Sequence, residues 1–143
     1  MKKYTVGFIF TPDYSQVLLV RKNRPEWQRG LLNGVGGKIE EGELSVDCMI
    51  REVREETKLE TKAEDWYYYT RIENANRFVD FYVATYSGPI FDAVTVTDEP
   101  VEWFPVSPLP VNVIFNLNWL IPLAIDAARS RKIHAVINDE GEK

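Results

Sequence analysis

The sequence predicts an α/β (α+β) fold, in which a mixed central β-sheet is sandwiched between helices as three layers. Two observations carry this prediction. β-rich runs recur along the chain, and two segments repeat apolar residues at the helical period. At 143 residues the chain suits one domain, residues 1–143, and we find no repeat, linker or low-complexity segment.

The first half of the chain alternates extended segments with turns. Before the first helix we expect a strand at 4–11, a turn at 12–15, a strand at 16–22, a loop at 23–30, a short extended piece at 31–33 and then a Gly-rich loop. The helix spans about 44–58. Its apolar residues recur every three or four positions, as a core-facing stripe does: Val46, Met49, Ile50 and Val53.

The second half adds more strands and one helix. We expect strands at 66–73 and 77–86 around a turn at 74–76, then strands at 101–106 and 133–137, and a frayed tail at 138–143. An amphipathic helix fits 117–131. Because proline is tolerated in the first turn of a helix, Pro122 moves the expected start of this helix towards Ile121.

The first helix carries three carboxylates on one side. Glu52, Glu55 and Glu56 are spaced by three and four residues, so they fall within an arc of roughly 100°. Like charges this close repel, and a hard cation such as Mg²⁺, which takes oxygen ligands and shares them with phosphates, relieves the repulsion. A solvated acidic helix face is the alternative explanation. Arg51 can reach Glu55 and relieve part of the repulsion.

Charge and composition exclude several classes. A net charge of −5 argues against a nucleic-acid polymer as partner. A polyanionic nucleotide needs divalent cations to bridge it to the carboxylates. The one cysteine, Cys48, excludes a disulfide framework and is expected to be a small core residue. With no signal peptide and no apolar stretch near 20 residues, we expect a cytoplasmic protein without membrane contact.

A longer pattern surrounds the helix. From Gly37, five residues lead to Glu43 and seven more to Arg51-Glu52. Glu55-Glu56 and an aliphatic residue, Leu59, follow. This pattern resembles the Nudix box of the Nudix hydrolases over residues 37–59, with six specified positions matched. Lys58 stands where the family usually has glycine at the helix end. It can either adopt a left-handed conformation or mark a different helix end.

Segments outside the box are similar to the MutT-like branch of the family, which includes hydrolases of oxidised purine nucleoside triphosphates. The matching segments are 17–22, 32–38, Asp98-Glu99, Trp103-Phe104 and, more loosely, 115–123. The resemblance implies a Nudix-type α/β/α sandwich with a catalytic loop–helix–loop.

The resemblance also implies site residues. Glu52, Glu55 and Glu56, with Gly37, would hold Mg²⁺, or alternatively Mn²⁺. Glu43 and Arg51 would buttress the loop and helix as an ion pair, and Arg51 can instead orient a catalytic carboxylate. Three residues are candidates for the base that activates water: Glu55, Glu56 and Glu99. A solvated turn is the alternative for Asp98-Glu99. The only histidine, His134, is assigned no role, and a Ser-His-Asp arrangement has no support.

Other residues would meet the substrate. Asn33 is the leading reader of the base, because an amide offers donors and an acceptor. The phosphates could meet cations, of which Lys38 is the first choice, or these residues could be ordinary surface charge: Arg21, Lys22, Arg24 and Lys38. The base pocket could use Phe115, Asn116 and Asn118, whereas Trp119 is expected to pack in the core.

The resemblance thus implies metal-dependent hydrolysis of a nucleoside diphosphate linked to a group X. We expect a nucleoside triphosphate pyrophosphohydrolase that gives nucleoside monophosphate and pyrophosphate, with 8-oxo-dGTP or a related purine nucleotide as a candidate substrate. An ADP-ribose or nucleoside diphosphate sugar hydrolase is the alternative within the same chemistry. A nucleotide-sensing module without catalysis is the alternative outside it. A monomer and a homodimer both remain open.

Overall fold

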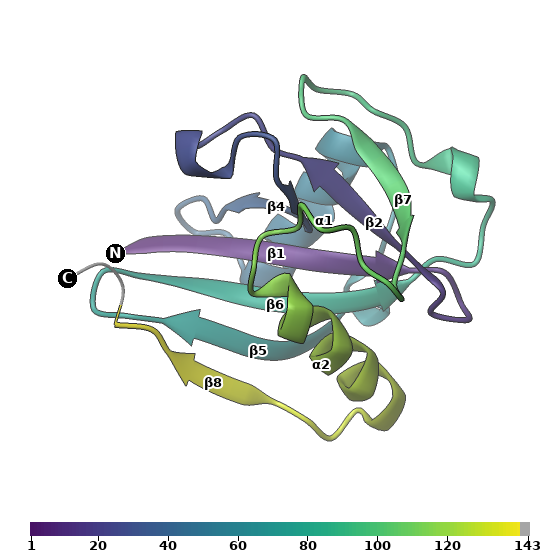
Figure 1. Ribbon diagram of the computed structural model, residues 1–143. Coiled ribbons are helices and arrows are strands. Elements are labelled where there is room, and N and C mark those ends of the chain that lie inside the picture. Colours follow the sequence, from purple (N-terminus) through teal and green to yellow (C-terminus); the bar gives the residue numbers. More distant parts are fainter. Residues whose placement is uncertain (141–143) are drawn as a thin grey trace.

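In the computed structural model, which describes residues 1–140, a mixed sheet of eight strands lies between two α-helices (Figure 1). Helix α1 (Ser45–Thr57) covers one face and helix α2 (Leu117–Ser130) the other. The strands are β1 (Lys2–Phe10), β2 (Gln16–Arg21), β3 (Leu32–Asn33), β4 (Val35–Lys38), β5 (Tyr67–Glu73), β6 (Arg77–Thr85), β7 (Val101–Pro105) and β8 (Ala135–Asn138). This arrangement confirms the expected three-layer fold.

The sheet mixes both strand directions. Its order is β3-β2-β1-β6-β5-β8, with β4 paired to β1 and β7 paired to β2. The pairs β1–β6 and β5–β8 are parallel, and the other pairs are antiparallel. Strand β4 lies beside the first half of β1, while β2 reaches β1 only at its far end. Strand β2 therefore diverges from β1 towards the end of the sheet where β1 and β6 begin, and β4 takes its place beside β1.

Alternation along the central strands builds two cores. Phe8 and Phe10 of β1 pack towards α2, whereas Ile9 packs towards α1. In β2, Val17 and Leu19 face α2, and their neighbours face α1. Both faces are apolar because a helix covers each of them. No helix in residues 1–140 combines the length and the apolar character needed to cross a membrane.

Helix α1 ends at the position where the box departs from its usual glycine. Lys58 adopts the left-handed conformation, with φ of 65°, and its N–H donates to Arg54 O at 3.0 Å. Such a conformation costs a non-glycine residue about 1–2 kcal/mol. Burial of Leu59 and the bond from its N–H to Thr57 Oγ1 at 3.1 Å offset that cost. Of the two helix ends considered for Lys58, the left-handed turn is the one observed.

Three expectations about the elements were wrong. The Gly-rich segment is the strand β4, because Gly36 and Gly37 pair with Val6 and Thr5 of β1. The helix expected over 117–131 is confirmed as α2, but its start is not moved towards Ile121. Pro122 lies within the helix, where burial of the apolar side against the sheet offsets one lost backbone bond.

The tail does not begin at Asn138. That residue belongs to β8, and Asp139 N–H donates to Glu73 O at 2.8 Å. Residues 141–143 of the predicted tail lie outside the described residues.

Candidate active site

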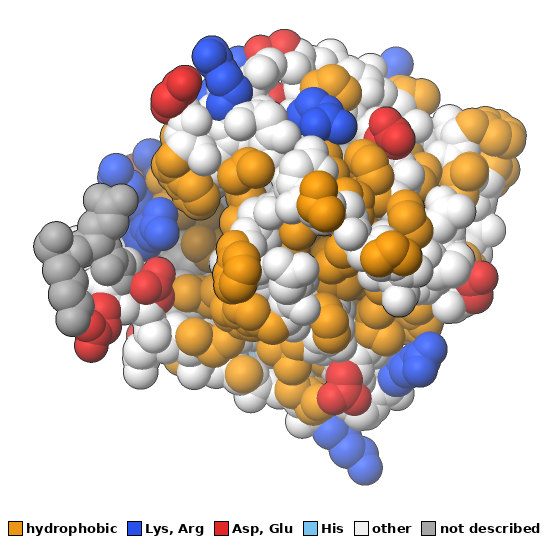
Figure 2. Space-filling view, in the orientation of Figure 1, with side chains coloured by type: hydrophobic (Ala, Val, Ile, Leu, Met, Phe, Trp, Pro, Cys, Tyr) orange, Lys and Arg blue, Asp and Glu red, His pale blue; other side chains and the backbone are white. Residues whose placement is uncertain are grey.

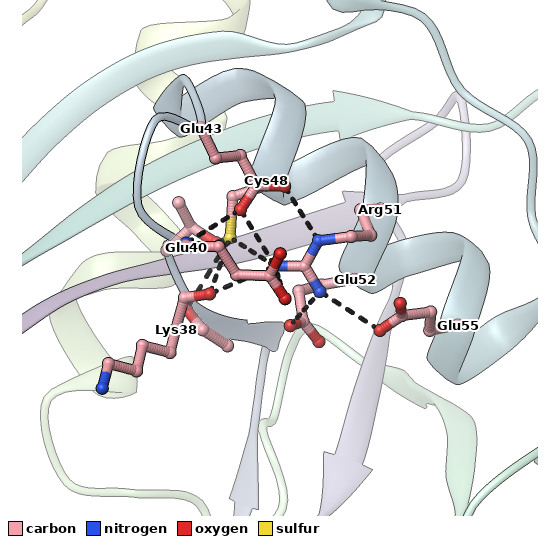
Figure 3. A network of polar contacts seen from close by, with 9 residues as sticks. Lys38, Glu40, Glu43, Cys48, Arg51, Glu52 and Glu55 are labelled. Carbon is pink, nitrogen blue, oxygen red and sulfur yellow. Dashed lines mark hydrogen bonds and ion pairs between the residues drawn. The ribbon is translucent and has the colours of Figure 1, made fainter.

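Arg51 lies at the centre of the polar network on α1 (Figure 3). Its Nε and Nη2 donate to the two carboxylate oxygens of Glu43, at 2.8 and 3.0 Å, and Nη2 also donates to Lys38 O at 3.1 Å. These bonds tie the helix to the loop before it and to the end of β4. The hydrogen bonds from Arg51 lower the pKa of Glu43 to about 2. The sequence-predicted ion pair therefore exists in the structure.

The same guanidinium contacts two of the three helical carboxylates. Arg51 Nη1 donates to Glu52 Oε1 at 3.0 Å and to Glu55 Oε2 at 3.3 Å (Figure 3). Glu52 is mostly buried, whereas the Glu55 side chain is 56% exposed. Residues 1–140 contain no group of three His, Cys, Asp or Glu side chains placed to hold a metal ion. The three predicted carboxylates lie on one helix, but two of them contact Arg51 and the three do not converge on one point.

Glu56 turns inward from the same helix. The residue is 9% exposed, and its Oε2 is buried without a hydrogen-bond partner. Burial, together with the nearby charge of Glu52, raises the pKa of Glu56 to about 8, while the charge of Lys22 acts in the opposite direction. An unpartnered buried carboxylate oxygen needs a proton or a cation, so Glu56 fits a metal ligand better than a structural contact.

Glu99 lies near this carboxylate although it is distant in sequence. It is 5% exposed and accepts hydrogen bonds from Lys22 Nζ at 3.1 Å, from Asn23 N–H at 2.6 Å and from Arg24 N–H at 3.3 Å. Burial alone would raise the pKa of Glu99, but these bonds and the Lys22 charge outweigh it and lower the pKa. Glu99 is therefore an ionised carboxylate and not the solvated turn residue of the alternative interpretation.

Two of the predicted phosphate-binding cations have carboxylate partners. Lys22 is bonded to Glu99, and the exposed guanidinium of Arg24 pairs with Asp98. Lys38 is exposed, and no carboxylate in residues 1–140 pairs with its side chain. Of Lys22, Arg24 and Lys38, only Lys38 has a side chain that no carboxylate within residues 1–140 pairs with, so it is available to an anion.

A cavity of about 300 Å³ opens on the α2 side of the sheet, beside β4. Four of the residues predicted to bind substrate line it: Lys22, Asn33, Lys38 and Asn116. Asn33 Oδ1 accepts from Gly34 N–H at 2.8 Å, which leaves its NH₂ group to donate to a ligand. The cavity is large enough for part of a nucleotide and lies directly against the Gly-rich strand.

Two predicted pocket residues do not line this cavity. Phe115 is 82% exposed, and the Asn118 side chain donates to Phe115 O at 2.9 Å. Trp119 is 40% exposed and belongs to neither core, so the expectation that it packs in the core was wrong. In the first turn of α2, Asn118 and Trp119 face outward, because the buried positions are Leu117, Leu120 and Ile121. Cys48 is buried, as expected.

Sequence reasoning missed several residues of the cavity wall. Trp27 and Gln28 come from a short 3-10 helix, Glu26–Gln28, while Tyr4 and Arg77 come from the first residues of β1 and β6. A tryptophan beside a proline in a polar loop was a usable signal for Trp27. Nothing local marks Arg77, which reaches the cavity only through strand pairing.

Gly37 joins the two halves of the site. A Cβ atom at this position would lie 2.4 Å from Glu52 Oε1, so only glycine leaves room for the carboxylate against the strand. Glu52 approaches from the α1 side, whereas Gly37 also lines the cavity on the α2 side. Strand β4 therefore lies between the carboxylates of α1, whose oxygens suit a hard metal ion, and a cavity whose lining includes Lys22 and Lys38.

Comparisons with known proteins agree with this geometry. A family model described as "NUDIX domain" matches residues 1–122. No curated protein matches the chain. Among solved structures, a NUDIX hydrolase from Nitrosomonas europaea is 16% identical, with a TM-score of 0.74 over 96% of this chain and 79% of that one.

Two further solved structures bear more specific names. An ADP-ribose pyrophosphatase from Streptococcus suis is 21% identical, with a TM-score of 0.69 over 96% of this chain and 98% of that one. A MutT/nudix family protein from Enterococcus faecalis is 19% identical, with a TM-score of 0.61 over 73% of this chain. The matched part spans only 43% of the Enterococcus chain. At these identities the three likenesses show a shared fold.

Proposed function

The chain belongs to the NUDIX domain family, and from that premise we propose that it is a nucleoside triphosphate pyrophosphohydrolase. It is a hydrolase of phosphoanhydride bonds, as the members of this family are. In the proposed reaction, water attacks a phosphorus of the triphosphate chain, and nucleoside monophosphate and pyrophosphate leave. The observation that carries the proposal is the contact of Gly37 with both Glu52 and the cavity, which puts carboxylates beside the place for a phosphate chain.

Nudix hydrolases generally use divalent metal ions, and we propose Mg²⁺ here, with Mn²⁺ as a substitute. The donors fit a hard cation, because all three are carboxylates and Glu56 Oε2 is buried without a partner. Glu52, Glu55 and Glu56 would hold the ion, with Gly37 giving backbone access. Such an ion, when bound, neutralises phosphate charge and lowers the pKa of a bound water.

The protein's own residues then position the reactants. Arg51 and Glu43 hold the loop, strand and helix together, so that little of the charge arrangement has to be reorganised during the reaction. Glu56 and Glu99 are the candidates for accepting the water proton. Glu99 is ionised, and Lys22, which is bonded to Glu99, is close enough to Glu56 for its charge to lower the pKa of Glu56. Glu55 is the third candidate and is the most exposed of the three.

The cavity supplies the proposed substrate contacts. Asn33 would donate to the base, Asn116 would add a second amide, and Lys38 would meet the phosphates. The MutT-like segments support a purine such as that of 8-oxo-dGTP. The roles proposed for Lys22 and Arg24 are weaker, since Glu99 and Asp98 already hold them.

A substrate panel with product identification tests the proposal. Nucleoside triphosphates, 8-oxo-dGTP and ADP-ribose would be incubated with Mg²⁺ or with EDTA, and the products separated by ion-exchange chromatography. We expect monophosphate and pyrophosphate from at least one triphosphate, only with the metal. Glu56→Gln should lower kcat by about 100-fold or more. The exposed Glu64→Gln is the matched control.

Two other functions have separate outcomes in the same panel. The Streptococcus suis structure favours an ADP-ribose hydrolase as second candidate, which would release AMP and a sugar phosphate. A nucleotide-sensing module would bind nucleotide tightly without turnover, and Glu56→Gln would leave that binding unchanged. Absence of products from every triphosphate would refute the proposed substrate class.

A further inference from the structure

Three cations surround one tyrosine at the end of the sheet where β1 and β6 begin. In the strand register, Tyr4 of β1 lies opposite Lys38 of β4 and opposite Val79 of β6. Two residues earlier on the same strands, Lys2 lies opposite Arg77. Because side chains two residues apart share a face and paired residues share it too, Lys2, Tyr4, Lys38 and Arg77 lie on one face.

This face is the one that the cavity occupies. Tyr4, Lys38 and Arg77 line the cavity, and so do Val6 and Val79, which share their face of β1 and β6. Thr5 also borders the cavity, but its side-chain hydroxyl lies 3.4 Å from Cys48 Sγ, towards α1. Figure 2 shows Lys and Arg side chains gathered at the left, over this end of the sheet. The cations therefore flank the mouth of the cavity and not the carboxylate helix.

A bound anion would relieve repulsion among these cations. Lys2 and Arg77 carry like charges and lie opposite one another on the parallel strands β1 and β6. The ion pairs among residues 1–140 include none of the three cations. Although the protein has 22 Asp and Glu residues, none of those within residues 1–140 lines the cavity. Glu73 and Asp139 line an adjoining hollow of about 70 Å³, whose wall also includes Arg77.

The three cations lie at different distances from Gly37. Lys38 is its chain neighbour, whereas Arg77 is on the other side of β1, because β4 and β6 flank that strand and are two strand spacings, roughly 10 Å, apart. A phosphate chain that is cleaved beside Gly37 can meet Lys38 there, so a ligand that also contacts Arg77 has to carry a further anionic group on the far side of β1.

We propose that Lys2, Lys38 and Arg77, with the Tyr4 hydroxyl, bind a further phosphate group carried by the substrate outside the cleaved diphosphate. That phosphate is either attached to the sugar or terminal on a phosphate chain longer than a triphosphate. This inference rests on the proposed function, because it assigns a second contact to the same nucleotide. Guanidinium and ammonium groups both donate strong charge-assisted bonds to phosphate.

Isothermal titration calorimetry in EDTA separates this site from catalysis. Adenosine 3′,5′-bisphosphate is compared with AMP, adenosine tetraphosphate with ATP, and inorganic phosphate is titrated alone. If the further phosphate is attached to the sugar, we expect the wild-type protein to bind adenosine 3′,5′-bisphosphate about tenfold more tightly than AMP. If it is terminal on the chain, we expect adenosine tetraphosphate to bind about tenfold more tightly than ATP. Arg77→Gln and Lys2→Gln should each reduce that ratio, and the double variant should bring it close to one.

Lys3→Gln is the matched control. Lys3 is next to Lys2, has the same charge and exposure, but lies on the other face opposite Phe78. The ratio should therefore stay unchanged in Lys3→Gln. A ratio near one for both nucleotide pairs in the wild type would overturn the inference. The inference would also be overturned if Lys3→Gln reduced the affinity ratio as much as Lys2→Gln does. It would likewise be overturned if only the binding of inorganic phosphate, and not of either nucleotide pair, depended on Lys2 and Arg77.

The two proposals fail in different ways. Turnover of triphosphates with no dependence on Lys2 or Arg77 in either pair overturns this inference and leaves the hydrolase intact. Binding that depends on these cations, without turnover of any triphosphate, supports the phosphate site and refutes the triphosphate substrate. Thermal unfolding of each variant shows whether lost binding reflects lost folding.

Discussion

Arg51 and Glu43 are joined by two hydrogen bonds, from Nε and Nη2 to the two carboxylate oxygens, at 2.8 and 3.0 Å. Both side chains are mostly buried, at 24% and 14% exposure. Such a two-pronged bond restricts orientation as well as distance. It fastens the first turns of α1 to the preceding loop, while Arg51 Nη1 still holds Glu52.

Replacing Arg51 by methionine should destabilise the protein by about 1–3 kcal/mol at pH 7, because Glu43 loses its partner in a partly buried place. The pKa of Glu43 lies near 2 in the folded protein, so its stabilising contribution is present above the ordinary value of 4.5 and is lost as the pH falls towards 2. Urea unfolding should therefore show a smaller difference between wild type and variant at pH 3. Arg54→Met, at an exposed ion pair, serves as control. An equal difference at both pH values would contradict this account.

Glu56→Gln should stabilise the metal-free protein at alkaline pH. The pKa of Glu56 is raised to about 8, so between pH 4.5 and 8 the folded state retains a proton that the unfolded state has lost. Wild-type stability thus falls with rising pH across this window, and glutamine, which imitates the protonated form, removes that loss. We expect equal stability at pH 4 and a gain of roughly 2–4 kcal/mol at pH 8. Urea unfolding in EDTA measures it, with Glu64→Gln expected to show no pH-dependent gain.

Magnesium should reverse the order of stability of the wild-type protein and Glu56→Gln at pH 8. A cation that binds the folded state at Glu56 stabilises that state by mass action, because the unfolded chain has no preformed site. At pH 8 the wild-type Tm should rise as MgCl₂ is added, and the Tm of Glu56→Gln should rise much less. Differential scanning calorimetry with matched ionic strength measures this. Identical shifts in both proteins would place the ion elsewhere.

Alanine at the two adjacent glycines of β4 should have different effects. At Gly36 a Cβ atom would lie 2.0 Å from Thr5 O, a backbone atom that cannot move without disturbing the β1–β4 pairing. Gly36→Ala should therefore destabilise the protein by about 2 kcal/mol or more. At Gly37 the conflict is with the movable end of Glu52, so Gly37→Ala should fold and lose activity. Thermal unfolding and kcat, measured for both variants, decide this; loss of stability without loss of activity in Gly37→Ala would refute it.

Asp80 anchors the start of α1 to the sheet. Its buried carboxylate accepts hydrogen bonds from Arg71 Nε at 2.7 Å, from Tyr68 OH at 2.8 Å and from Ser45 Oγ at 2.8 Å. Asp80→Asn leaves Arg71 with an uncharged partner and should cost about 2–4 kcal/mol of unfolding free energy. Asp126→Asn, on the exposed side of α2, should cost less than about 0.5 kcal/mol. Denaturant unfolding compares the two, and similar costs would contradict an anchoring role.

Local pattern was sufficient to predict much of the scaffold. The helical period of Met49 and Val53 predicted α1 and its buried side, and the spacing of Glu43 and Arg51 predicted their contact, because both depend on residues close in sequence. Element boundaries were less predictable. Pro122 suggested a later start for α2, but the propensity of one residue is small beside the burial of a whole apolar helix face.

The sequence by itself determined the three-layer fold, the acidic face of α1 and the family, since these follow from periodicity and spacing within short segments. Only the tertiary structure decided that Lys22 meets Glu99, 77 residues away, that Glu56 turns into the interior, and that Lys2 lies opposite Arg77. Those relationships arise where strands distant in sequence pair in a particular register. Strand register is set by the apolar pattern of the strands and by the turns between them, and not by the polar side chains that it brings together.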